Sequence, residues 1–137
     1  MDEQIKTDIK TVCERAFDDM VANASAEQKA CSDAERARFL SEPEFAATEL
    51  AKLNEDFTNA DANGDGKLNI AEFAVFLDNC KARSVAKGHY WNIIESMEDM
   101  YNLHNRHSEG DGITMEDFKL SMGYWMEVWS GKMAAAQ

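Results

Sequence analysis

Side chains that carry oxygen alternate along one short segment of the chain, residues 61–72. Carboxylate and amide oxygens at every second position of a tight loop can point at one centre, and a hard divalent cation takes roughly six to eight oxygens at about 2.3–2.6 Å. Counting the backbone carbonyl of the lysine, the candidate ligands are Asp61, Asn63, Asp65, Lys67, Asn69 and Glu72. The chemistry predicted here is therefore the binding of a metal ion.

The same segment contains the other residues that such a loop needs. Gly66 allows a sharp turn with positive φ, after which Lys67 can turn its carbonyl inward and its ammonium to solvent. Asn69 and Glu72 have the spacing of a capping box, which starts a helix. With Leu68 between them, these residues make the segment resemble the twelve-residue calcium loop of the EF-hand family.

That resemblance implies Ca²⁺ as the bound ion, with both carboxylate oxygens of Glu72 closing the shell and Asn69 reaching the ion through water. It also implies that Leu68 forms a short β-bridge with a partner loop. The alternative is an acidic helix cap, because Asp, Asn and Gly are ordinary turn residues. A cap alone does not account for ligands at loop positions 1, 3, 5, 9 and 12 with glycine at position 6, so we favour the calcium loop.

A second polar segment, residues 105–117, matches the pattern incompletely. One alignment places Arg106 at the first ligand position, where its charge would repel calcium. Another puts Gly112 where the apolar bridge residue belongs, and its ligand positions would be Asn105, His107, Glu109 and Glu116. We favour a thirteen-residue loop from Asn105 to Asp117 with an insertion at 111–112, which restores Ile113 as the bridge residue but leaves few carboxylates in reach.

Helices must position both loops. The chain has 1 Pro and 7 Gly, four of the glycines lie in the two polar segments, and apolar residues elsewhere recur at helical spacing. The pattern predicts an all-α fold with a connection at 84–88 and a frayed tail at 133–137. The predicted helices cover about 3–22, a short stretch from a capping box at Ser32, 43–60, 70–83, Tyr90–Tyr101 and 115–129.

The order helix, loop, helix occurs twice, which predicts that residues 45–130 form paired EF-hands, one with an intact loop and one with a degenerate loop. Residues 1–44 are expected to add two N-terminal helices, a hairpin packed on the pair. Their length would also suit a decayed EF-hand, but residues 25–36 contain neither a turn glycine nor a series of ligands. Residues 131–137 are the predicted tail.

Composition limits the classes of partner. The net charge of -12 disfavours binding of nucleic acid or anionic membranes and favours cations and basic peptides. The N-terminus lacks the pattern of a signal peptide, no apolar run is long enough to span a bilayer, and three widely spaced cysteines suit a reducing compartment. We expect a cytoplasmic protein without a membrane anchor. No Ser-His-acid, Cys-His or phosphate-binding pattern indicates an enzyme.

Methionine and tryptophan concentrate after residue 90, including Trp125 and Trp129. Such side chains can repack around partner helices, as in calmodulin-like sensors, but apolar stripes at helical spacing more often fill a core. Cys13 and Cys80 lie on apolar stripes and are expected to be buried and inert, with Cys31 exposed. We favour a calcium-dependent regulator of a partner that offers a basic amphipathic helix. The alternatives are a buffer or store of the sarcoplasmic calcium-binding type and a constitutive light-chain-like subunit.

Overall fold

Helices account for most of the computed structural model, which describes residues 3–92, 95–105 and 112–136, and for 129 and 132–136 describes the backbone alone. The prediction of an all-α fold is confirmed over these residues. The helices are α1 (Glu3–Asn23), α2 (Ala26–Ser41), α3 (Pro43–Ala60), α4 (Ile70–Ala86), α5 (Met97–Asn105) and α6 (Met115–Ala136).

Local signals set most helix starts. Proline in the first turn of α3 costs no hydrogen bond, since the first backbone N–H groups of a helix have no partner within it. Asn69 and Glu72 cap α4 reciprocally, as their spacing predicted. At α5 the hydroxyl of Ser96 accepts a hydrogen bond from the backbone N–H of Asp99 at 3.1 Å.

Several predicted boundaries were wrong. The capping box that starts α2 is formed by Ser25 and Gln28, so Ser32 lies inside the helix. The predicted helix from Tyr90 begins only at Met97, because Ser96 caps α5 there. α4 continues to Ala86, past the predicted end at residue 83, and α6 continues to Ala136, so the predicted frayed tail is helical over 133–136.

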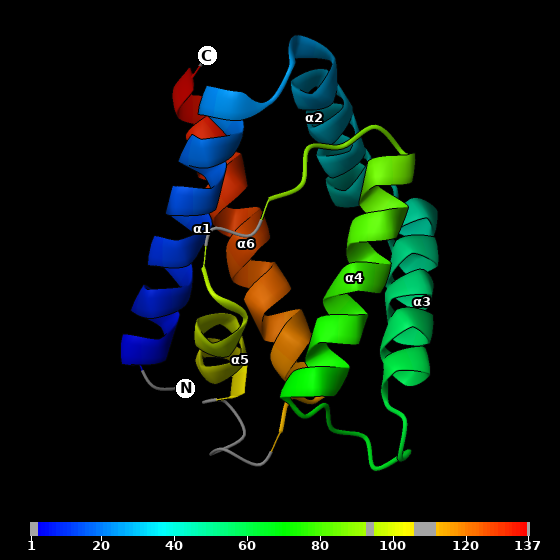
Figure 1. Ribbon diagram of the computed structural model, residues 1–137. Helices are drawn as coiled ribbons and strands as arrows, with labels where there is room; N and C mark the ends of the chain where they lie inside the picture. The colour runs from blue at the N-terminus through cyan, green and yellow to red at the C-terminus, as the bar shows by residue number, and fades with distance from the viewer. Residues whose placement is uncertain (1–2, 93–94, 106–111, 137) are drawn as a thin grey trace.

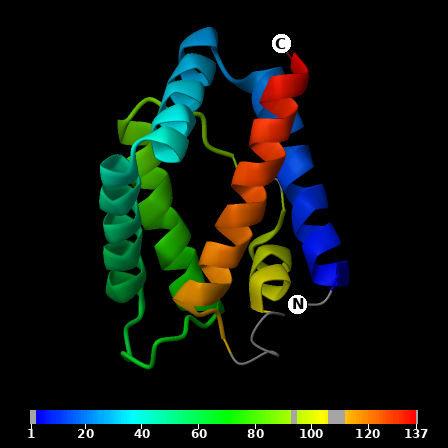
Figure 2. The same ribbon diagram turned by 180° about the vertical axis from the view of Figure 1, so that it is seen from behind.

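The helices form two groups, and side chains of both groups line a cavity. α1 lies along α6, and α2 and α4 both lie against α3 on the other side of the molecule (Figures 1 and 2). One apolar cluster joins α3, α4 and the segment before α6, and its fully buried members include Leu68, Phe73, Phe76 and Ile113. α5 contacts α4, α6 and α1 and so connects the two groups.

The two N-terminal helices are held in different ways. α1 buries Ile5, Ile9 and Cys13 against α6, where Trp125 and Val128 pack on them. None of the side chains of α2, residues 26–41, is buried, and polar contacts fix this helix to its neighbours. Over the residues that the structure describes, no helix combines the length and apolarity needed to cross a bilayer.

Candidate metal centre

α3 and α4 position the predicted calcium loop between them. Asp61 ends α3, where its backbone N–H donates to the carbonyl of Phe57 at 3.0 Å, and Asn69 begins α4. Between these caps the chain turns at Gly64 with φ of 68° and at Gly66 with φ of 81°. Both values lie in the left-handed region that favours glycine, which confirms the turn predicted at Gly66.

The loop's own side chains hold its backbone in place. Asp61 Oδ2 accepts a hydrogen bond from the N–H of Gly66 at 2.8 Å, and Asp65 Oδ1 accepts one from the N–H of Lys67 at 2.9 Å. Asn63 Oδ1 accepts from the N–H of Asp65 at 3.3 Å. Short polar side chains stabilise turns in this way. Each of these residues therefore binds the backbone with one oxygen, and each aspartate retains a second.

Glu72 connects the two ends of the loop. Its side chain is buried, with Oε1 accepting from the N–H of Asn69 at 3.0 Å and Oε2 accepting from the N–H of Ala62 at 2.8 Å. The bond to Asn69 belongs to the predicted capping box, since Asn69 Oδ1 in turn accepts from the N–H of Glu72 at 2.9 Å. The bond to Ala62 was not predicted, and it joins the last residue of the loop to the second.

One oxygen in this arrangement has no partner. Asp61 Oδ1 is buried, and no donor in the described part of the chain reaches it. A buried polar atom left in this state costs about 1–3 kcal/mol, more for a charged group, and a cation beside it would remove that cost. The other five predicted ligand residues line a common hollow of about 150 Å³: Asn63, Asp65, Lys67, Asn69 and Glu72.

The chemistry of the donor set fits a hard cation. Carboxylate, amide and carbonyl oxygens are the ligands that calcium prefers, and nitrogen and sulfur donors are absent from the predicted set. Across residues 3–92, 95–105 and 112–136, no three His, Cys, Asp or Glu side chains gather closely enough to hold a metal. The predicted calcium ligands also include the amide oxygens of Asn63 and Asn69 and the backbone carbonyl oxygen of Lys67, which are donors of other kinds.

A β-bridge connects the loop to the segment before α6. Leu68 and Ile113 form an antiparallel pair with N–O distances of 2.8 and 3.0 Å, and both side chains are fully buried. The bridge between these two residues was predicted and is confirmed. Gly112 has φ of 108°, and a Cβ there would lie 3.0 Å from the Cβ of Lys67. A side chain at this position would therefore be strained both by the positive φ and by the contact with Lys67.

The end of the second segment resembles the end of the first. Thr114 Oγ1 accepts from the N–H of Asp117 at 3.1 Å, and Asp117 Oδ2 accepts from the N–H of Thr114 at 3.0 Å, which repeats the exchange made by Asn69 and Glu72. Asn105 Oδ1 accepts from the N–H of Gly112 at 2.7 Å. Other ligand positions considered for this segment, Arg106, His107, Glu109 and the turn at 110–111, lie outside the described residues.

Two histidines that the sequence did not single out make specific contacts. His104 is buried in α5, 5.7 Å from the ring of Phe73 between centroids, and its Nδ1 lies 2.7 Å from the hydroxyl of Ser121. Its spacing of three residues from Tyr101 placed it on the apolar face of the helix. His89 contacts Ser32 and Glu35 of α2, more than fifty residues away in sequence, and no local pattern signals such a contact.

Comparison of the chain with protein-family models, with curated proteins and with solved structures found no match in any of the three. What the loop binds is therefore inferred from its own residues and their geometry.

Proposed function

We propose that this protein binds one Ca²⁺ ion per chain in the loop of residues 61–72 and uses that ion to regulate a partner. Two observations of the same loop carry the proposal: Oδ1 of Asp61 is buried without a partner in the described part of the chain, and the other candidate ligands line a common hollow. A metal ion in contact with this oxygen would offset the free-energy cost of burying it without a hydrogen bond.

The charge of the site suits a divalent ion. Asp61, Asp65 and Glu72 supply three carboxylates, and Asn63 and Asn69 supply neutral oxygens. A calcium ion bound there would attract carboxylates from both ends of the loop, Asp61 at its start and Glu72 at its end. A set of this composition corresponds to affinities on the order of 10⁻⁷–10⁻⁵ M, which is the range of calcium sensors.

We further propose that the loop and the segment after α5 are a pair of EF-hands, of which the second is degenerate. The bridge between Leu68 and Ile113 and the reciprocal caps at the starts of α4 and α6 support this pairing. In the second segment, the residue that corresponds to Glu72 is Asp117, whose side chain is shorter by one methylene group. One full set of ligands therefore predicts one ion per chain.

Calorimetric titration with calcium tests the site. We expect one ion per chain, and loss of that binding in Asp61→Asn, which removes the charge at the unpartnered oxygen. Asp78→Asn is the matched control, because Asp78 is exposed on α4 and the variant has the same net charge. Absence of binding by the unaltered protein, or equal binding by both variants, would refute the proposal.

A regulatory role is supported by the position of α4. Glu72 lies in the first turn of α4. The inner face of α4, which includes Leu77 and Cys80, borders the space between the two groups of helices. Calcium that draws Glu72 from the backbone N–H groups towards the ion would shift α4 against that space. The acidic net charge favours a basic amphipathic helix as partner, which would have to displace α1 or α2 to enter that space.

The calcium-buffer alternative makes a different prediction. A buffer would release heat on binding calcium but would not bind a basic amphipathic peptide. A second calorimetric titration, with such a peptide added to the calcium-loaded protein and to the protein in chelator, separates the two functions. Binding that requires calcium supports the regulator, binding in both conditions supports a constitutive subunit, and no binding supports the buffer.

A further inference from the structure

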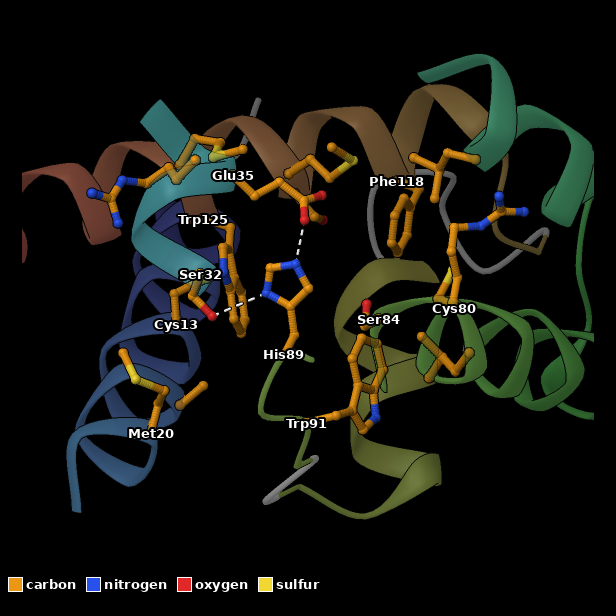
Figure 3. Close-up of a pocket in the computed structure, with 18 of the residues that line it drawn as sticks. Cys13, Met20, Ser32, Glu35, Cys80, Ser84, His89, Trp91, Phe118 and Trp125 are labelled. Atoms are coloured by element: carbon orange, nitrogen blue, oxygen red, sulfur yellow. Dashed lines mark hydrogen bonds and ion pairs between the residues drawn. The ribbon is translucent and has the colours of Figure 1, made fainter. Parts of the chain in front are cut away.

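The space between the two groups of helices contains a cavity of about 420 Å³. All six helices that the structure describes, and the link before α5, contribute to its wall. Figure 3 shows Cys13 and Met20 on one side, Cys80 and Ser84 on another, and Trp91 and Trp125 flanking His89. Sites for small molecules fall in the range of about 300–1,000 Å³, so this cavity is of a suitable size.

Apolar and aromatic side chains make up most of the wall. Besides the two tryptophans they include Phe39, Phe118, Met20 and Met122. Neutral polar groups are interspersed among them, such as the hydroxyl of Ser84. This is the usual composition of a ligand site, where apolar surface gives affinity and a few polar groups fix orientation.

The charged side chains of the wall are already paired with one another or with a neighbour. Lys87 contacts Glu35 at 3.0 Å and Glu49 at 2.8 Å, and His89 contacts Glu35 as well. Arg83 binds Asp56 through two hydrogen bonds of 2.7 and 3.2 Å. The other arginine of the wall, Arg36, pairs with Asp33 at 3.4 Å. A charged ligand would have to break one of these pairs, whereas an uncharged ligand would not.

The volume also distinguishes between occupants. A helix about 10 Å across and ten residues long fills on the order of 1,200 Å³, far more than the cavity offers. A helical partner therefore requires α1 or α2 to move away first. A small molecule of two or three rings is of the size that a cavity of this volume holds as it stands.

We propose that this cavity is a binding site for an uncharged, mostly apolar small molecule of about two or three fused or linked rings, carrying no more than a hydroxyl, carbonyl or amine for hydrogen bonding. The walls of the cavity and the loop of residues 61–72 share no residue, so this site is distinct from the proposed calcium site, although a shift of α4 on calcium binding would change one wall of the cavity.

Two fluorescent probes with the same ring skeleton test it. N-phenyl-naphthylamine is neutral, and anilinonaphthalene sulfonate differs by one anionic group. Titrations in chelator keep the result separate from the proposed calcium site. We expect saturable binding of the neutral probe at one per chain, at least about tenfold tighter than the anionic probe. Equal affinity, or no saturable binding of the neutral probe, would overturn the proposal.

A substitution that fills the cavity tests whether the probe binds inside it. Ala16 of α1 is on the wall, while Ala22 of the same helix is exposed and away from it. Ala16→Phe should weaken binding of the neutral probe by about tenfold or more, and Ala22→Phe should leave it unchanged. If Ala16→Phe does not fold, energy transfer from tryptophan to the probe replaces it as the test. The energy transfer should fall in Trp91→Phe. Unchanged affinity for the probe in a folded Ala16→Phe variant, or unchanged energy transfer in Trp91→Phe, would show that the probe binds elsewhere.

Discussion

Replacement of Gly112 by alanine tests the contact between the two loops most directly. At this position φ is 108°, and an added Cβ would lie 3.0 Å from the Cβ of Lys67 and 3.3 Å from the carbonyl oxygen of Leu68. The backbone conformation alone costs a residue with a side chain about 1–3 kcal/mol. The close approach to Lys67 adds to this, because a Cβ atom bonded directly to the backbone cannot turn aside.

We therefore expect Gly112→Ala to lower the free energy of unfolding by about 2–4 kcal/mol, which for a chain of this length corresponds to a fall in Tm of roughly 6–16 °C. Urea and thermal unfolding, followed by circular dichroism in the presence of chelator, measure both quantities. Amide hydrogen exchange should also accelerate at Leu68 and Ile113, because their paired N–H groups would be displaced.

Gly123 provides the control with the opposite sign. It lies inside α6, and an added Cβ would meet nothing within 4 Å. Alanine there should raise the free energy of unfolding by about 0.5–1 kcal/mol, since glycine is unfavourable within a helix. If Gly112→Ala destabilised the protein no more than an ordinary surface substitution, about 0.5 kcal/mol, the close approach of the loops would be refuted.

Three further outcomes are expected. Glu72→Gln should weaken calcium binding in calorimetry by more than about 100-fold, because loss of a ligand exceeds the effect of losing a supporting residue; unchanged affinity would move the site elsewhere. Burial raises the pKa of the Cys13 thiol to about 12, and the charge of Glu14 adds to the effect. Burial also raises the pKa of the Cys80 thiol to about 12, and there the charge of Asp56 adds to the effect. Alkylation at pH 8 followed by mass spectrometry should therefore modify Cys31 first, and equal labelling of all three native thiols would contradict this. In a calcium-dependent regulator, calcium should change the fluorescence of Trp125, and a basic amphipathic peptide should change it again; heat of binding without either change would favour a buffer.

Most of the structure that the sequence predicted depends on local signals. The turn at Gly66 and the cap formed by Asn69 and Glu72 follow from residue types at fixed short spacings. The bridge between Leu68 and Ile113 joins residues far apart in the sequence, and it was predicted from the resemblance of the loop to paired calcium loops. Ser25 and Ser32 both had the spacing of a capping box, and local pattern alone did not show which one starts α2.

Other features depend on contacts that no window of sequence contains. The apolar stripe of α1 could have covered any exposed face of the pair, and only the assembled structure shows that it lies on α6. Cys13 is buried as predicted, Cys80 is half-buried, and Cys31, predicted to be exposed, is half-buried because its thiol donates to the carbonyl of Lys87. The contact of His89 with Glu35 likewise joins residues more than fifty positions apart.

α2 has a consequence for how the molecule opens. Its attachment relies on the ion pair between Lys87 and Glu35 and on hydrogen bonds such as that of Cys31, whereas the contact of α1 with α6 buries apolar surface. Ion pairs near the surface weaken as salt screens them, with a Debye length of about 8 Å at physiological ionic strength, but apolar contacts do not weaken in this way. We therefore expect higher ionic strength to weaken the attachment of α2 more than that of α1, so that the cavity would open to solvent on the side of α2 first.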